Sequence, residues 1–266
     1  MEHNKELTAI LDLIDRRQLR KALDALESFA YKYPEMSITP RLGDLREDYN
    51  LMADYWQRGY RDDQRSEVYD RLLRQAYSLT TDVAHEYAVA HQPFLSYASR
   101  RVRPAAGQYD TMLDTLKDRL EGFVTDGAML QLETAQIRQS RQADLYDKHQ
   151  QLLAQMFDYV WTSGQWKDNE ADTLEQIALS PTVDAIDQQV LVTAVTLSAM
   201  ACFDIRKLRM LVQVYLQSPD EHVRQRALVG WVLALGQDKA RLFPDEQKWV
   251  DATLADDRTV GELAEL

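Results

Sequence analysis

A cluster of arginine and tyrosine side chains has the residue types best suited to binding a partner. Its members are Tyr97, Arg100, Arg101, Arg103 and Tyr109. Arginine and tyrosine are enriched at binding hot spots, and a group of cations favours an acidic partner. Because Pro104 and Gly107 discourage a continuous helix, we interpret residues 100–108 as a docking loop. A solvated loop is the alternative, and arginine with aromatic rings can also hold a phosphate chain.

Two further aromatic residues fit the helical patterns around them less well than their neighbours do. Tyr55 lies in the second predicted helical pair, and Trp166 follows Gly164, which closes a predicted helix. An exposed aromatic side chain at either position would mark an interaction groove. We therefore include Tyr55 and Trp166 among the candidate partner-binding residues, with packing in the core as the alternative.

The sequence contains no group of reactive side chains whose spacing matches a catalytic or metal-binding pattern. His85 and His91 lie six residues apart, which turns them about 240° from each other around a helix. Cys202 lies in the most apolar predicted helix, where a thiol is inert. The chain has no glycine-rich phosphate loop and no nucleophile elbow. We therefore predict no catalytic, metal-binding or cofactor-binding residue, and we expect a protein that is not an enzyme.

The acidic composition restricts the classes of partner. The 266 residues carry a formal net charge of −12, which disfavours nucleic acid and anionic membrane surfaces. Residues 1–110 contain 16 Lys and Arg against 18 Asp and Glu, whereas the remainder contains 15 against 25. The longest weakly polar run has 14 residues, 190–203, and a bilayer span needs about 20. Together with the single cysteine, which is typical of a reducing compartment, these features predict a cytoplasmic protein without a membrane partner.

The candidate residues are predicted to lie on, or between, amphipathic helices. Nine glycines and seven prolines are too few for the turns of an all-β fold. Apolar residues recur at spacings of three and four. The clearest apolar stripes cover residues 7–14, 19–33, 45–60, 69–77, 109–123 and 145–161. We predict an all-α fold of stacked antiparallel helical hairpins, or α-α superhelix, with a loop at 34–43.

The second half of the chain contains an internal repeat. Ser180-Pro181 and Ser218-Pro219 lie 38 residues apart, and each is predicted to open an apolar helix. Residues 218–228 resemble the second helix of a HEAT-type repeat, in which an acidic start is followed by Val-Arg and a small residue. In this interpretation Ser218 caps the helix and Glu221 completes a capping box. The resemblance covers about residues 165–240 and implies a curved stack of helices.

The N-terminal hairpin is similar to a tetratricopeptide unit. Ala22 and Pro34 stand where that family places an alanine and a terminal proline, although Ile10 stands where it places glycine. The predicted organisation is therefore tetratricopeptide-like hairpins over residues 1–105 and HEAT-like repeats over residues 106–266, with one continuous array as the alternative.

These resemblances imply a non-catalytic module for protein–protein interaction or scaffolding, which binds a protein or peptide along one face. The alternative function is that of a HEAT-like repair enzyme of the alkyl-DNA glycosylase type, which the acidic net charge disfavours. A domain that binds a small molecule is a third possibility. Residues 244–266 end in an apolar stretch, so we also expect that the chain packs against further domains or is a segment of a longer protein.

Charge reversal tests the arginine cluster. We expect that changing Arg100, Arg101 and Arg103 together to Glu abolishes the capture of an acidic protein partner from native cell extract, because like charges then face each other. The measurement is affinity capture on wild-type and variant protein in parallel. Equal recovery of the same partner on both would contradict a docking role for this cluster.

Overall fold

The computed structural model describes residues 4–34, 36, 38–59, 64–102, 109–235 and 242–265. Within these residues the chain forms thirteen helices and no strand, so the predicted all-α fold is confirmed. The helices are α1 Lys5–Asp15, α2 Leu19–Lys32, α3 Thr39–Gln57, α4 Arg65–His91, α5 Pro93–Val102, α6 Tyr109–Leu130, α7 Ala135–Trp161, α8 Asp168–Leu179, α9 Ala185–Ala201, α10 Ile205–Gln217, α11 Glu221–Leu235, α12 Pro244–Leu254 and α13 Asp257–Ala264. None of these described helices combines the length and the apolar character needed to cross a membrane.

The chain divides into two compact units. Unit 1 comprises Met1–Gln92 and Gly236–Thr259, and unit 2 comprises Pro93–Leu235 and Val260–Leu266. The predicted loop at residues 100–108 begins inside a helix, because Arg100 and Arg101 form the last turn of α5. A proline restricts only the residue directly before it, so Pro104 does not unwind that turn. Residues 103–108 lie outside the described residues.

The helices of unit 1 bury the apolar stripes that the sequence predicts. α1 packs against α2 and α4, and α3 packs against α2 and α4. The buried side chains of α1 and α2 are Leu7, Ile10, Ile14, Leu19, Ala22, Leu23, Leu26 and Phe29. α1 and α2 therefore pack together through the apolar stripes predicted at residues 7–14 and 19–33, and they share their core with α3 and α4.

The connection between the first two pairs is shorter than predicted. The sequence predicts a loop over residues 34–43, but α3 already begins at Thr39. Pro40 lies in the first turn of α3, where the backbone N–H groups have no partner inside the helix. Proline is therefore compatible with the helix at this position. The first turn of α3 thus occupies residues that were predicted to form the loop.

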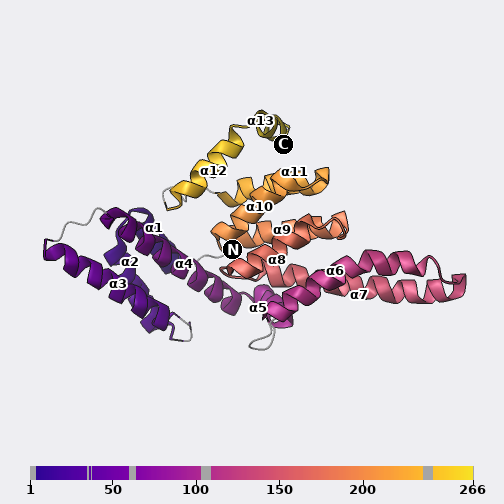
Figure 1. Cartoon of the computed structure of the whole chain (residues 1–266). Helices are drawn as coiled ribbons and strands as arrows, with labels where there is room; N and C mark the ends of the chain where they lie inside the picture. The colour runs from indigo at the N-terminus through magenta and orange to yellow at the C-terminus, as the bar shows by residue number, and fades with distance from the viewer. Residues whose placement is uncertain are drawn as a thin grey trace. The chain divides into compact units, whose positions relative to one another are not determined.

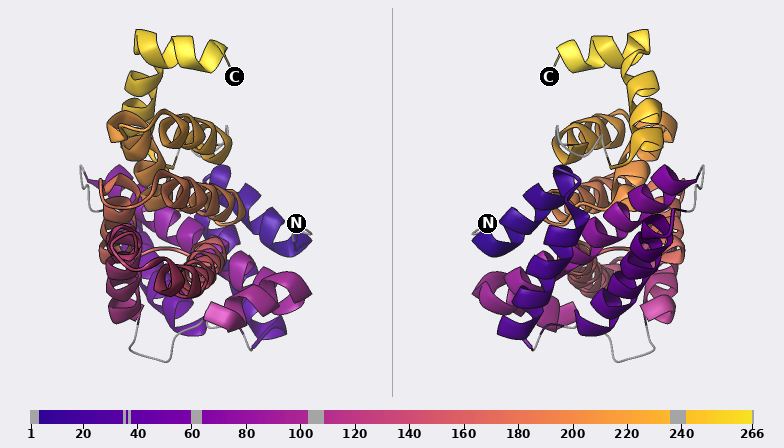
Figure 2. Two further views of the ribbon diagram at one scale, coloured as in Figure 1. Left: turned by 90° about the vertical axis from the view of Figure 1, so that its right-hand side faces the viewer. Right: turned by 90° about the vertical axis from the view of Figure 1, so that its left-hand side faces the viewer.

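Unit 2 is a series of packed helix pairs. α6 packs against α7, α8 against α9, and α10 against α11. Successive pairs also pack on each other, through α6, α8 and α10 on one side and α7, α9 and α11 on the other. The pairs therefore form two rows, α6–α8–α10 and α7–α9–α11, which can be followed by colour in Figure 1 and Figure 2. α5 packs against α7 and continues the second row.

Many contacts in unit 2 join residues at a constant sequence offset of 38. The pairs with this offset are His149 with Asp187, Gln165 with Phe203, Trp166 with Asp204, Asp168 with Arg206, and Arg224 with Glu262. The offset equals the separation of the two Ser-Pro pairs. Five contacts within unit 2 therefore join residues separated by the same interval as the two Ser-Pro pairs.

The two Ser-Pro pairs end helices and do not begin them. Ser180 is the C-cap of α8 and Ser218 is the C-cap of α10, with ψ of 126° and 129°. A residue before proline is pushed into this extended region, so each proline stops the preceding helix. The next helices begin after Asp184 and Asp220, whose carboxylates accept hydrogen bonds from first-turn N–H groups. The capping role predicted for Ser218 is therefore performed by Asp220.

A fully buried lysine joins the turn after α7 to α9 and α10. Lys207 Nζ donates to the carbonyl oxygens of residues 163 and 164 at 3.0 and 2.7 Å and to Ser198 Oγ at 2.9 Å. The carboxylate of Asp204, which is also fully buried, accepts a hydrogen bond from the backbone N–H of Trp166. A buried charge is tolerated when its hydrogen-bonding groups are satisfied and an opposite charge lies nearby.

α11 approaches α9 so closely that a side chain at one position of the interface would displace a neighbouring residue. A Cβ atom built on Gly230 would lie 2.3 Å from Thr196 Oγ1. Thr196 is held in place because its hydroxyl donates to the Val192 carbonyl oxygen at 2.8 Å. The absence of a side chain at residue 230 therefore sets the distance between the two helices.

Gly230→Ala is expected to lower the free energy of unfolding by about 1–3 kcal/mol, the usual effect of overpacking a core. The measurement is urea unfolding followed by circular dichroism. Gly127→Ala in α6 is the control, since nothing lies within 4 Å of that added methyl and alanine gains up to about 1 kcal/mol in a helix. Thr196→Ala should restore part of the stability lost by Gly230→Ala. Wild-type stability of Gly230→Ala would contradict the close approach.

Candidate binding groove between α6 and α7

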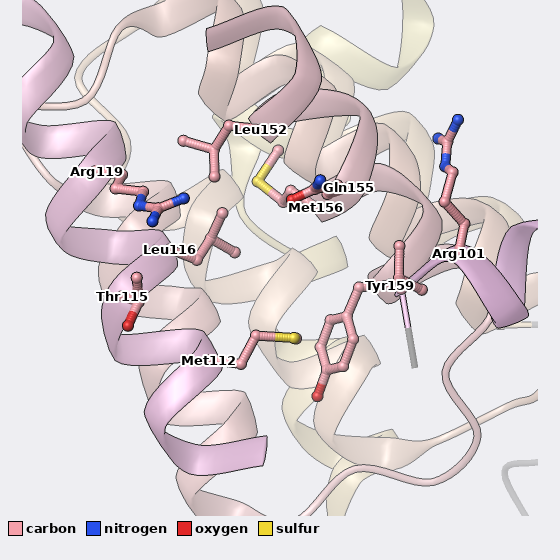
Figure 3. A pocket seen from close by; sticks show the side chains of 10 residues that line it. Arg101, Met112, Thr115, Leu116, Arg119, Leu152, Gln155, Met156 and Tyr159 are labelled. Atoms are coloured by element: carbon pink, nitrogen blue, oxygen red, sulfur yellow. The ribbon is translucent and has the colours of Figure 1, made fainter. Parts of the chain in front are cut away.

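A groove runs between α6 and α7 and is bordered by the end of α5 (Figure 3). Its first cavity has a volume of about 570 Å³. The apolar lining residues are Val102, Met112, Leu116, Leu152, Met156 and Tyr159, and the polar ones are Arg101, Thr115, Arg119 and Gln155. In Figure 3 Met112 from α6 and Tyr159 from α7 point toward each other across the cavity. The groove therefore has an apolar floor and polar edges.

A second cavity of about 590 Å³ continues the groove along the same two helices. The residues that line both cavities are Arg119, Leu152 and Gln155. Among the described residues, two arginines and no carboxylate line the first cavity. The second is mixed in charge, because Asp118 and Asp126 line it together with Lys148 and Arg119. The net positive charge of the groove is therefore concentrated in the first cavity.

The two arginines of the first cavity are held differently. Arg101 forms an ion pair with Asp158 of α7, and its guanidinium donates to the carbonyl oxygen of Ala154 at 3.4 Å. Arg119 is exposed and forms no ion pair with a described side chain. Arg101 therefore ties α5 to α7, whereas Arg119 keeps a positive charge that a bound partner can use.

A buried hydrogen-bonded pair lies beneath the second cavity. His149 of α7 and Asp187 of α9 are 8% and 4% exposed, and their hydrogen bond joins Nε2 of His149 to Oδ1 of Asp187 at 3.1 Å. The imidazole stacks on Phe123 of α6 with ring centroids 3.5 Å apart, and its Nδ1 has no partner among the described residues. Burial raises the pKa of the Asp187 carboxyl, although the hydrogen bond to His149 lowers it in part. The pair therefore connects both walls of the groove to α9.

The structure brings one residue of the predicted arginine cluster into the groove. Arg101 lines the first cavity. Tyr97 and Arg100 are exposed on α5 but are not among the residues that line either cavity. Arg103 and the side chain of Tyr109 lie outside the described residues. Of the two neighbouring arginines of the cluster in the described part of the chain, Arg101 therefore lines the groove and Arg100 does not.

Trp166 is not the exposed aromatic side chain that would mark an interaction groove. Trp166 is only 4% exposed, and its indole N–H donates to Ser163 Oγ at 2.7 Å. It is buried because both its ring and its backbone N–H belong to the network around Lys207. Tyr55, in unit 1, is 49% exposed and lines a separate cavity of about 270 Å³.

The residues that form most of the groove were not singled out from the sequence. Met112, Leu116 and Arg119 follow one face of α6 at helical spacing, but this pattern does not show which face stays uncovered. His149 and Asp187 were detectable in principle, because their separation equals the 38-residue offset of the Ser-Pro pairs. A search for polar residues at that offset would have paired them.

The side chains of the groove are suited to binding. Methionine is flexible and polarisable and adapts to different apolar partners, and both Met112 and Met156 line the first cavity. Among the described residues, no group of three or more His, Cys, Asp or Glu side chains is arranged to hold a metal ion. Comparison with known proteins gives no match to a protein family, a curated protein or a solved structure.

Asp187→Asn tests the buried pair through the pH dependence of stability. The pKa of Asp187 is raised in the folded state, so this carboxyl loses its proton more readily in the unfolded chain. Raising the pH from the usual aspartate pKa to the folded-state pKa therefore favours the unfolded state. We expect the stability of wild type relative to Asp187→Asn to fall as the pH rises above the usual pKa of an aspartate, about 4, and to level off above the raised folded-state pKa, as measured by urea unfolding. Asp187→Ala leaves the His149 donor unpaired and should lose about 1–3 kcal/mol. A difference between wild type and Asp187→Asn that is independent of pH would refute the raised pKa.

Proposed function

We propose that this protein is a non-catalytic helical-repeat module that binds a protein or peptide in the α6–α7 groove. The observation that carries the proposal is the groove itself, with its apolar floor, its two methionines and Arg119, which forms no ion pair with a described side chain. Apolar grooves between helices with charged edges are a recurring way to bind peptides. The groove belongs to a unit that is packed by helix pairs on its other side, which provides a firm base for recognition.

The shape of the groove favours a polypeptide over a compact small molecule. Its lining residues extend from Met112 to Asp126 on α6 and from Leu145 to Tyr159 on α7. At 1.5 Å of rise per residue, each wall is about 20 Å long. A chain segment of several helical turns covers such a length, whereas a single small ligand fills only part of it.

We further propose that unit 2 is a HEAT-like array. Two observations support this proposal, namely the stacking of its helix pairs in two rows and the 38-residue offset of the contacts between pairs. The resemblance of residues 218–228 to the second helix of such a repeat agrees with it. Arrays of this kind present extended surfaces to partners, which is the role proposed for the groove.

Site-specific photo-crosslinking tests the proposed function. A photoreactive amino acid in place of Gln155, an exposed residue that lines both cavities, should form covalent adducts with one or a few polypeptides in the native cell. Gln150 is the matched control, since it is an exposed glutamine of the same helix that is not among the lining residues. Adducts are resolved by gel electrophoresis and identified by mass spectrometry. Absence of an adduct at position 155, or identical adducts at both positions, would count against the groove as a binding site.

A further inference from the structure

We infer that the groove receives an amphipathic α-helix that places a carboxylate beside Arg119. This inference rests on the proposed function, since it specifies the kind of polypeptide that binds. Three features of unit 2 support it: the arrangement of its helices around α6, the spacing of the apolar residues in the groove, and the charges at its edge.

The arrangement of helices favours a helical partner. α6 packs extensively against α7 and α8, and α7 against α6, α9 and α5. The row α7–α9–α11 is thus continued past α7 by α5, whereas among the described helices of unit 2 none packs extensively against α6 on that side. The first cavity lies at this place, since α5, α6 and α7 all line it. A partner helix in the groove would extend the row of α6 in the way that α5 extends the row of α7.

The apolar floor has the spacing that a helix requires. Met112 and Leu116 are four residues apart on α6, and Leu152 and Met156 are four apart on α7. Ridges of residues spaced by four form the grooves into which the side chains of another helix pack. Leu116 and Met156 are buried at 6% and 1% exposure, so they form the packed base of the groove. Met112 and Leu152, which are partly exposed, present the apolar surface that a stripe on the partner would cover.

The charges define the polar edge of the partner. Among the described residues that line the first cavity, Arg101 and Arg119 are the charged ones. Asp158 already neutralises Arg101, whereas Arg119 has no ion pair with a described side chain. Covering Arg119 with an apolar or basic surface would remove a cation from water without compensation. An aspartate or glutamate next to the apolar stripe of the partner provides that compensation.

A peptide selection tests the inference on the full chain. The probe is a displayed library with two arms, helix-forming peptides of about 20 residues and peptides of the same length interrupted by a central proline, both randomised at the remaining positions. We expect enrichment of helix-forming sequences with Asp or Glu beside an apolar stripe. Arg119→Glu should weaken the enriched peptides by about tenfold or more, because close charge pairs at an interface are strongly coupled. Fluorescence anisotropy of synthesised peptides provides the affinities.

Arg209→Glu is the matched control for charge. It makes the same change on an exposed arginine of α10 that is not among the residues lining the groove, so the affinity should stay within about twofold of wild type. Met112→Glu places a charge on the apolar floor and should abolish binding at the groove. Thr115→Trp at an exposed lining position replaces Met112→Glu if circular dichroism shows that the latter is unfolded.

The possible outcomes separate the two proposals. Enriched peptides that are helical, acidic and sensitive to both Arg119→Glu and Met112→Glu support the inference. Peptides that are basic, neutral or proline-interrupted, but that are still lost in the groove-blocking variant, overturn the helical acidic partner and leave the proposed function standing. Peptides that bind the groove-blocking variant as well as wild type, or no enrichment at all, overturn both.

Discussion

The buried ammonium group of Lys207 is the constraint on which the packing of unit 2 depends. An ion is stable away from water only if its donors are satisfied, so the chain must bring two carbonyl groups and a hydroxyl to one point. These acceptors come from the turn after α7 and from α9, while Lys207 itself lies in α10. One side chain therefore fixes the end of α7 relative to two later helices. Because α7 forms one wall of the groove, the contacts of Lys207 also help to position that wall.

The packing of unit 2 changes along its rows. At one end, α9 and α11 approach so closely that Gly230 has no room for a methyl group. At the other end, α6 and α7 leave two joined cavities lined by flexible side chains. The His149–Asp187 pair lies between these regions and links them through α9. Regions with few buried contacts are those best able to rearrange around a partner, so the groove lies where the unit has most freedom and the firmest part lies away from it.

The sequence predicts the helices of this structure better than it predicts the groove between α6 and α7. The stripes of α1 and α2 were readable because each helix has one buried face, and Pro34 marks the end of the second. The N-terminal half of α7 was only weakly patterned, since most residues from 135 to 148 are exposed and no core imposes a stripe on them. Trp166 could not be placed because its burial depends on Asp204, which is 38 residues away. The groove was not predictable, because only packing shows which face of α6 is left uncovered.

The shared offset of 38 residues has a consequence for the entropy that folding of unit 2 must overcome. Four hydrogen bonds within this unit each close a chain segment of that same length. The entropy lost on closing a segment depends on the number of residues in it. These four contacts therefore carry about the same closure entropy, and none of them is disfavoured against the others by the distance along the chain.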